Sequence, residues 1–293
     1  MDKDNRRTIE ELIARYQFEP ELRDIYVEGN GDKLLLEWFL RKLGCRDVSV
    51  FEIDCVDIPN QVIQDLKLEQ NNRDEVIALS LLFHNNLKDD CDHLICIADS
   101  DYDFLLGRKH DSRYLIYTDY TSMDLYFCSA SIVEKVLMLG VRKIPCDVQQ
   151  LFDNLIDVLQ KVFLVRATNV RLGWNLEWND FRRCCSIRDN FVIIDCDELI
   201  NRYLSKNARR SSKPDFIRVY TGLKAKALKD FRHRIRGHDF LTILGWYIAK
   251  HVREGGNKYN DPNIIRAMIF PAIDMDHLVR EPLFSRLLSK YKS

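Results

Sequence analysis

The chain has 293 residues, of which 46% are hydrophobic and 30% are charged, a composition typical of a soluble globular protein that can bury a sizeable core. No apolar run approaches the roughly 18 residues that a membrane helix needs. The polar start MDKDNRRTIEE lacks the apolar region of a secretory signal, so we expect a cytoplasmic protein without membrane spans. The nine cysteines follow no CxxC or Cys/His ligand spacing, which predicts reduced thiols rather than structural zinc or disulfides.

The net charge of −1 hides a strong asymmetry between the two halves of the chain. Residues 1–150 carry 18 Lys and Arg against 29 Asp and Glu, whereas residues 151–293 carry 26 against 16. An acidic half that holds a metal site and a basic half that contacts phosphates would suit an enzyme that acts on phosphodiesters. The alternatives are that the two halves attract each other, or that the basic half faces a partner protein.

The first 130 residues alternate between strand-like and helix-like segments. Thr8 and Glu11 form a capping box that predicts a helix over residues 8–16. Asp32 is placed to cap another helix over residues 33–43. Apolar runs and helical spacing predict strands over residues 24–27, 48–53, 94–98 and 114–117, and a helix over residues 72–87. This alternation predicts an α/β fold with βαβ units and a mostly parallel sheet flanked by helices.

Beyond residue 130 the pattern is mainly helical. We therefore divide the chain into a metal-binding catalytic core over residues 1–130, which includes the N-terminal helix, and a mainly helical basic region over residues 131–293. Helices are expected over residues 129–139, 148–163, 197–205, 223–235 and 239–252, with one or two short helices after the break at residues 254–257. No Gly/Ser-rich linker separates the two parts.

Three aspartates, Asp99, Asp101 and Asp103, stand at alternate positions directly after the apolar run of residues 94–98. Such a run suits a buried strand of a parallel sheet, whose carboxyl end is the place where these sheets bind ligands. Crowded carboxylates repel one another unless a cation neutralises them, and hard oxygen ligands suit Mg²⁺ or Mn²⁺. Glu28 follows the predicted strand over residues 24–27, so we expect it at the same edge. Taken alone, Glu28 could be a solvated turn residue, and Asp103 could equally cap a loop.

A second DxD pattern, Asp195 and Asp197, follows the apolar run of residues 191–194. Haloacid-dehalogenase phosphatases also use a strand followed by DxD, with the first aspartate as the nucleophile. Their motif continues to Thr or Val at the position where Leu199 stands here. We therefore interpret Asp195 or Asp197 as a residue that begins a helix, and a phosphatase stays an alternative.

Residues 202–238 form the main basic stretch, with twelve Lys and Arg against two Asp. The candidates for contact with a nucleic-acid backbone are Arg209, Arg210, Lys213, Lys224, Lys226, Lys229, Arg232 and His238. The interleaved aromatic residues could stack on bases, although their helical spacing favours the core; they are Tyr203, Phe216, Tyr220 and Phe231. The same basic side chains could instead dock a partner protein, and His238 could be a helix cap or a core residue.

Four segments together resemble TOPRIM-like nucleases: YVEGNGDK (residues 26–33), IADSDYDF (97–104), TDYTSMDLYF (118–127) and RGHDFL (236–241). They are similar to the nucleases related to OLD proteins that are paired with ABC-type ATPases, and most similar to the effector nucleases of PARIS phage-defence systems. TOPRIM domains place a glutamate after one strand and a DxD after a later one.

The resemblance implies that Glu28, Asp99, Asp101 and Asp103 hold one or two Mg²⁺ (or Mn²⁺) ions, with Glu28 as a ligand or as a general base. Asp124 stands where relatives often have Glu, so we assign it no metal. The resemblance also implies a nuclease that an ATPase sensor holds inactive until phage infection, that then cuts host tRNA, and whose active form could be a homodimer. The residues themselves do not distinguish RNA from DNA. The alternatives are another TOPRIM enzyme (a DNA nickase or an rRNA-maturing ribonuclease) and a degenerate TOPRIM assembly subunit.

Overall fold

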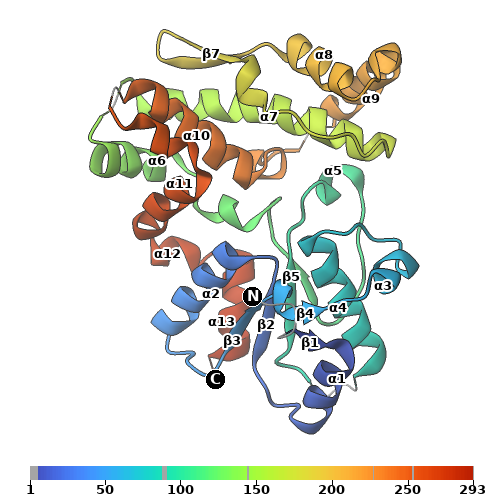
Figure 1. Cartoon of the computed structure of the whole chain (residues 1–293). Helices are drawn as coiled ribbons and strands as arrows, with labels where there is room; N and C mark the ends of the chain where they lie inside the picture. The colour runs from blue at the N-terminus through green and yellow to red at the C-terminus, as the bar shows by residue number, and fades with distance from the viewer. Residues whose placement is uncertain (1–5, 88–90, 144, 227, 253, 293) are drawn as a thin grey trace. The chain divides into compact units, whose positions relative to one another are not determined.

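The computed structural model describes residues 6–87, 91–143, 145–226, 228–252 and 254–292. The chain divides into two compact units (Figure 1). Unit 1 contains residues 1–100, 108–119 and 274–293, and unit 2 contains residues 101–107 and 120–273. Within the described ranges, no helix combines the length and the apolar character that crossing a membrane requires.

Unit 1 is built on a parallel sheet of four strands in the order β3-β2-β5-β6. The strands are β2 (Asp24–Val27), β3 (Ser49–Glu52), β5 (Ile95–Ala98) and β6 (Leu115–Tyr117). Tyr26 pairs with Phe51 on one side and with Cys96 on the other, and Ala98 pairs with Tyr117. All residues of β2 and β5 are buried, as the continuous apolar run of residues 94–98 predicts for β5. The predicted α/β class with a parallel sheet is therefore confirmed.

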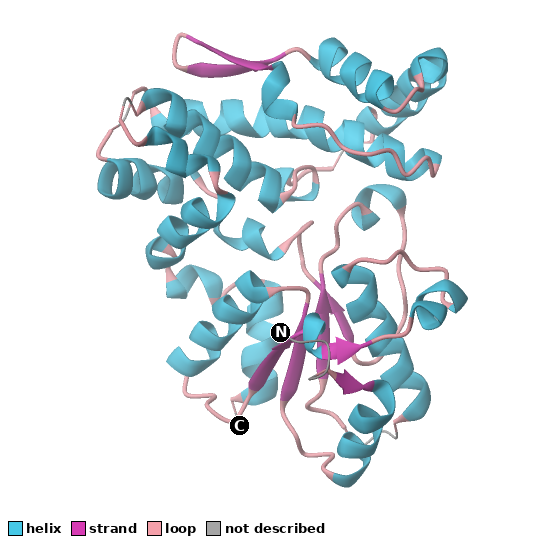
Figure 2. Ribbon diagram, in the orientation of Figure 1, coloured by secondary structure: helices cyan, strands magenta, loops and turns pink. Residues whose placement is uncertain are grey.

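Helices cover both faces of this sheet (Figure 2). In unit 1 they are α1 (Ile9–Phe18), α2 (Asn30–Lys42), α3 (Asn60–Asp65), α4 (Asn72–Asn86), α12 (Met275–Leu278) and α13 (Pro282–Tyr291), beside a short parallel pair of β1 (Arg7–Thr8) and β4 (Val56–Asp57). One buried cluster joins α1 and α4 to the sheet through Tyr16, Phe83, Tyr26 and Cys96. In Figure 1, α2 and α13 lie on the opposite side of the strands from α1 and α4.

The start of α1 agrees with the sequence prediction, whereas the start of α2 differs from it. Thr8 and Glu11 make the predicted capping box at α1, with hydrogen bonds of 2.8 and 3.2 Å. The prediction that Asp32 caps the next helix is wrong, because α2 already begins at Asn30 with the extended Gly29 as its N-cap residue. Asp32 instead lies in the first turn of α2, where a negative charge favours the helix dipole.

The C-terminal helix α13 completes unit 1. The Phe284 ring packs edge-on against Phe39 of α2 with 4.8 Å between centroids. The Leu283 N–H donates to Asp119 Oδ2 at 2.8 Å, and the Tyr291 hydroxyl donates to the carbonyl oxygen of His93 at 2.7 Å. The division that the sequence suggests at residue 130 differs from this arrangement, because a helix more than 150 residues away in sequence supplies part of the core of the sheet unit.

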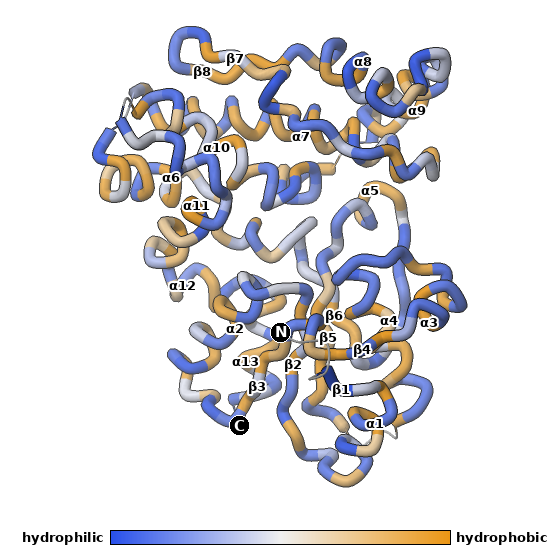
Figure 3. The backbone as a smooth tube through the Cα atoms, viewed as in Figure 1, coloured by the Kyte–Doolittle hydropathy of each residue, from blue (hydrophilic) through white to orange (hydrophobic). Residues whose placement is uncertain are grey.

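Unit 2 is mainly helical. It contains α5 (Asp103–Leu106), α6 (Ala130–Lys135), α7 (Val148–Leu172), α8 (Cys196–Lys206), α9 (Lys213–Lys224), α10 (Gly237–His251) and α11 (Pro262–Ile269), together with the hairpin of β7 (Cys185–Arg188) and β8 (Phe191–Ile194). Hydrophobic and hydrophilic segments alternate along α7, whose apolar side is buried (Figure 3). The helix predicted over residues 148–163 is thus present and continues to Leu172.

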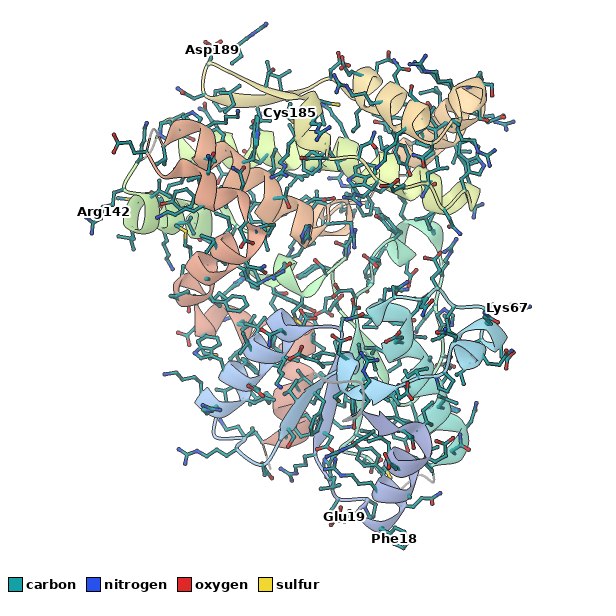
Figure 4. All side chains as sticks on the ribbon, viewed as in Figure 1. Phe18, Glu19, Lys67, Arg142, Cys185 and Asp189 are labelled. Atoms are coloured by element: carbon teal, nitrogen blue, oxygen red, sulfur yellow. The ribbon has the colours of Figure 1, made fainter. Side chains whose placement is uncertain are left out.

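Two parts of unit 2 differ from the sequence predictions. The prediction of a helix over residues 223–235 is wrong. Pro214 lies in the first turn of α9, which begins at Lys213 and ends at Lys224. Asp230 caps a separate short turn by accepting from the Arg232 N–H. The hairpin was not predicted. Asp189 and Asn190 form its two-residue turn with φ of 50° and 68°, and Asp189 lies at its tip (Figure 4).

Candidate active site

The sheet of unit 1 has a topological switch point between β2 and β5. The chain leaves β2 through α2 for β3 on one side, and it returns through α3 and α4 to β5 on the other side. Open α/β sheets bind ligands in the crevice at such a point, beyond the carboxyl ends of the strands. Glu28 directly follows β2 and Asp99 directly follows β5, so one carboxylate stands on each side of the switch point.

The two acidic residues are in direct contact. The backbone N–H of Asp99 donates to Oε1 of Glu28 with a nitrogen–oxygen distance of 2.6 Å. Both side chains belong to residues that are half-buried rather than fully exposed. A charged acceptor strengthens a hydrogen bond of this kind. The contact therefore fixes the Glu28 carboxylate beside the loop that carries Asp99, as the shared sheet edge predicts.

Side chains in the first turn of α4 form hydrogen bonds with the loop after β2 and with the loop after β5. Asn72 Nδ2 donates to the carbonyl oxygen of Glu28 at 2.8 Å, and Arg73 Nε donates to the carbonyl oxygen of Asp99 at 2.7 Å. Arg73 is itself held by an ion pair of 3.0 Å with Asp74. In the sequence, Asn72 and Arg73 indicate only the start of a helix. These two side chains orient the backbone on each side of the switch point.

The donor set suits a magnesium-like ion. Mg²⁺ keeps several waters and commonly takes only one or two protein carboxylates together with oxygens of the substrate. Glu28 and Asp99 carry two carboxylates that follow neighbouring strands at one edge of the sheet. Across the part of the chain that the structure describes, no group of three or more His, Cys, Asp or Glu side chains is arranged to hold a metal. The four-carboxylate site therefore stays a prediction.

Asp101 belongs to unit 2 and has an unusual backbone conformation. Its φ is +41°, in the left-handed region that few residues other than glycine adopt. The Asp101 N–H donates to the Thr121 carbonyl oxygen at 2.9 Å, and Oδ1 lies 3.4 Å from Nε of Arg236. Residues in such conformations cluster at functional sites, because the surrounding structure must hold them there. Arg236 of the RGHDFL segment, one of the twelve cations of residues 202–238, therefore joins the candidate residues.

Two further segments hold the backbone around Asp101. Thr121 donates its N–H to the Arg232 carbonyl oxygen at 3.2 Å and its hydroxyl to the carbonyl oxygen of Ile235. Gly237 donates its N–H to Ser122 Oγ at 3.1 Å. TDYTSMDLYF and RGHDFL, two of the segments that resemble TOPRIM-like nucleases, are thus in contact through Ser122 and Gly237 in unit 2. Asp103 is the first residue of α5, with Tyr102 as the N-cap residue, so it lies in the first turn rather than at the cap.

Asp124 is engaged by an arginine. Arg266 donates from Nε to Oδ1 at 3.0 Å and from Nη2 to Oδ2 at 2.9 Å. A Cβ on Gly237 would lie only 2.3 Å from the Cβ of Asp124, so the close approach of α10 to this pair requires glycine. A two-pronged ion pair in a packed position indicates a structural role for Asp124.

We expect Arg266→Gln to lower the free energy of unfolding by about 1–3 kcal/mol. The pair is largely buried, with side-chain exposures of 23% for Arg266 and 13% for Asp124, and removing one partner leaves a poorly solvated charge. Chemical denaturation measures the change. The matched control is Arg218→Gln, whose pair with Asp215 is exposed and should contribute nothing measurable. Equal stability of the two variants would contradict this role.

The predicted nucleic-acid contacts in unit 2 fall into two groups. Four have a polar partner within unit 2: Arg232 pairs with Asp230 at 2.8 Å, Lys213 pairs with Asp197 at 2.7 Å, Arg210 donates to Ser205 Oγ at 2.6 Å, and Lys226 donates to the Leu105 carbonyl oxygen at 2.8 Å. The others are the exposed residues Arg209, Lys224, Lys229 and His238. Of the interleaved aromatic residues, Tyr203 and Phe216 are fully buried, as the core interpretation predicts.

The second DxD pattern begins α8. Asp195 is the N-cap residue, and its Oδ1 accepts from the Glu198 N–H at 2.9 Å. Asp197 in the first turn is paired with Lys213. The interpretation of Asp195 as a residue that begins a helix is therefore confirmed.

The chain matches no protein-family model and no curated protein.

Proposed function

We propose that this protein is a divalent-metal-dependent nuclease with a TOPRIM-like core. The observation that carries the proposal is the contact of Glu28 with the Asp99 backbone at the switch point of a parallel sheet. Phosphodiester hydrolysis requires negative charge to be stabilised as it develops on the phosphate, and carboxylates that follow neighbouring strands at one sheet edge, as those of Glu28 and Asp99 do, suit the cation that provides this stabilisation. The proposal includes Asp101 and Asp103 as further ligands.

The residues divide the work. Glu28 and Asp99 would hold Mg²⁺ or Mn²⁺, which when bound polarises the phosphate and lowers the pKa of water. Asn72 and Arg73 keep the two acidic loops in place, because each fastens one loop by its carbonyl oxygen. Glu28 lies where it could also accept a proton from an attacking water, since its carboxylate is half-buried and held at Oε1.

We further propose that the enzyme acts in the cytoplasm as an effector of an anti-phage defence system. In this proposal an ABC-type ATPase sensor holds it inactive, infection releases it, and it cuts host tRNA, with a homodimer as the candidate active form. The four motif segments that resemble OLD-related nucleases support this part. The first half of the chain has a negative net charge and the second half a positive one, and the positive half supports a polyanionic substrate.

Metal dependence and substrate choice test the proposal together. Purified protein incubated with tRNA, single-stranded DNA and supercoiled plasmid is expected to cut tRNA with Mg²⁺ or Mn²⁺ and to lose all cleavage in excess EDTA. Nicking of plasmid without tRNA cleavage would favour another TOPRIM enzyme. A folded protein that cuts none of the three, with or without a co-expressed ATPase, would favour an assembly subunit.

A further inference from the structure

Unit 2 contains a small pocket between α5, α7 and α9 that none of the motifs described above includes. Its volume is about 220 Å³. Leu105, Phe163 and Leu223 form an apolar floor, and each is at least nine-tenths buried. The pocket adjoins α5, the helix that starts at Asp103.

The rim of the pocket is strongly cationic. Lys161, Lys224, Lys226 and Arg234 line it, against the single carboxylate of Asp157. Asp157 is already paired with Lys161 at 2.7 Å. Lys226 donates to the Leu105 carbonyl oxygen at 2.8 Å, which ties the rim to α5. The pocket therefore carries an excess of positive charge over an apolar base.

Arg234 is the most informative of these residues. Its Nε is buried, and among the described residues it meets no hydrogen-bond partner. Within the same part of the chain, no carboxylate lies within ion-pairing distance of the Arg234 guanidinium. A buried donor without a partner is costly, and a charged one more so. Arg234 also lines the pocket, so an anion that binds its guanidinium there would offset this cost.

We propose that this pocket binds one phosphate group of the polynucleotide substrate. Guanidinium and ammonium groups together are the usual ligands of phosphate, and the apolar floor strengthens each interaction by excluding water. The pocket is smaller than the roughly 300 Å³ at which sites for whole small molecules begin, so it takes a phosphate with part of its sugar rather than a complete nucleotide.

Because the pocket is tied to α5, a strand bound there is held close to the helix that carries Asp103. The identification of the ligand as substrate rests on the proposed function, whereas the anion site itself does not.

Fluorescence anisotropy with a labelled 20-nucleotide single-stranded RNA of mixed sequence tests the inference. All proteins carry Glu28→Gln, so that binding is read without cleavage. Lys224→Gln and Arg234→Gln should each weaken binding about tenfold and reduce the slope of log K against log salt by about 0.7. Arg218→Gln is the control, because it removes the same charge from the same helix away from the pocket and should change affinity less than twofold.

Equal weakening by Lys224→Gln and Arg218→Gln would overturn the inference, since it would reflect charge alone. Arg234→Gln could disturb the fold, so Lys224→Gln, which changes an exposed residue, decides the outcome in that case.

The second experiment measures the melting temperature of the protein with inorganic phosphate and with AMP. These compounds could raise the melting temperature of the protein with an intact pocket but not of the pocket variants, while the same variants bind RNA with unchanged affinity. In that case the ligand is a free phosphate compound, and the proposed role of the pocket in substrate binding is wrong. Pocket-dependent RNA binding by a protein that cleaves nothing would instead contradict the proposed function alone.

Discussion

Glu28→Gln is expected to reduce nucleic-acid cleavage by about 10²–10⁴-fold without a measurable change in stability. The glutamine keeps an oxygen that can accept the Asp99 N–H, so the loop contact of 2.6 Å can persist. It removes the negative charge that a divalent ion needs and the basicity that a proton acceptor needs. Loss of activity with an intact fold is the signature of a chemical role.

The measurement has a biochemical and a cellular readout. Initial cleavage rates at saturating Mg²⁺ give the first, and growth arrest or protection against phage in cells that carry the whole system gives the second. Glu37→Gln is the matched control, because Glu37 is another half-buried glutamate of unit 1, within α2, and should retain full activity. Full protection by a soluble, folded Glu28→Gln protein would show that the activity lies elsewhere.

The location of Glu28 and Asp99 at the same edge of the sheet could be predicted because it follows from local rules. Buried apolar runs predict parallel strands, parallel strands end at one edge, and a residue that directly follows a strand lies at that edge. The strand order could not be predicted in this way, since nothing in the runs themselves indicates that β5 rather than β3 completes the switch point. The contact between Glu28 and Asp99 depends on that order.

The role of residues whose side chains contact backbone atoms far away in the sequence could not be predicted. Asn72 and Arg73 look like ordinary residues of a helix start, and only the fold brings them to the carbonyl oxygens of Glu28 and Asp99. The left-handed conformation of Asp101 is equally invisible in the sequence, because aspartate adopts it only where neighbours such as Thr121 hold it. The hairpin turn Asp189-Asn190 did carry a local signal, since both residue types tolerate positive φ.

The basic stretch shows why composition is a weak guide to a binding surface. Twelve cations follow one another in residues 202–238, yet Lys213 and Arg232 are held by aspartates of the same unit. Among the described residues of this stretch, Arg234 is the arginine whose buried Nε donor meets no hydrogen-bond partner, and it was not among the predicted contacts. The net charge of a stretch indicates only the sign of the charge on its binding partner. Where that partner binds depends on which cationic side chains are not already in ion pairs within the protein.

The second large effect concerns the helix that the sequence assigned to the basic region. We expect Phe284→Ala to lower the free energy of unfolding by about 3–5 kcal/mol, because Phe284 is fully buried and its ring packs on Phe39 of α2. That loss is a large fraction of the 5–15 kcal/mol that typical domains have in total. Urea denaturation followed by circular dichroism measures it, and the melting temperature should fall in parallel.

Phe18→Ala is the matched control for Phe284→Ala, since Phe18 at the end of α1 is 87% exposed and points away from the protein (Figure 4). Its removal should leave stability within about 0.5 kcal/mol of the parent. The same reasoning predicts that a fragment of residues 1–130 will not fold, because it lacks the α13 groups that meet Phe39, Asp119 and His93. A soluble fragment that melts cooperatively at the parent temperature would show that the sheet needs no cover from α13.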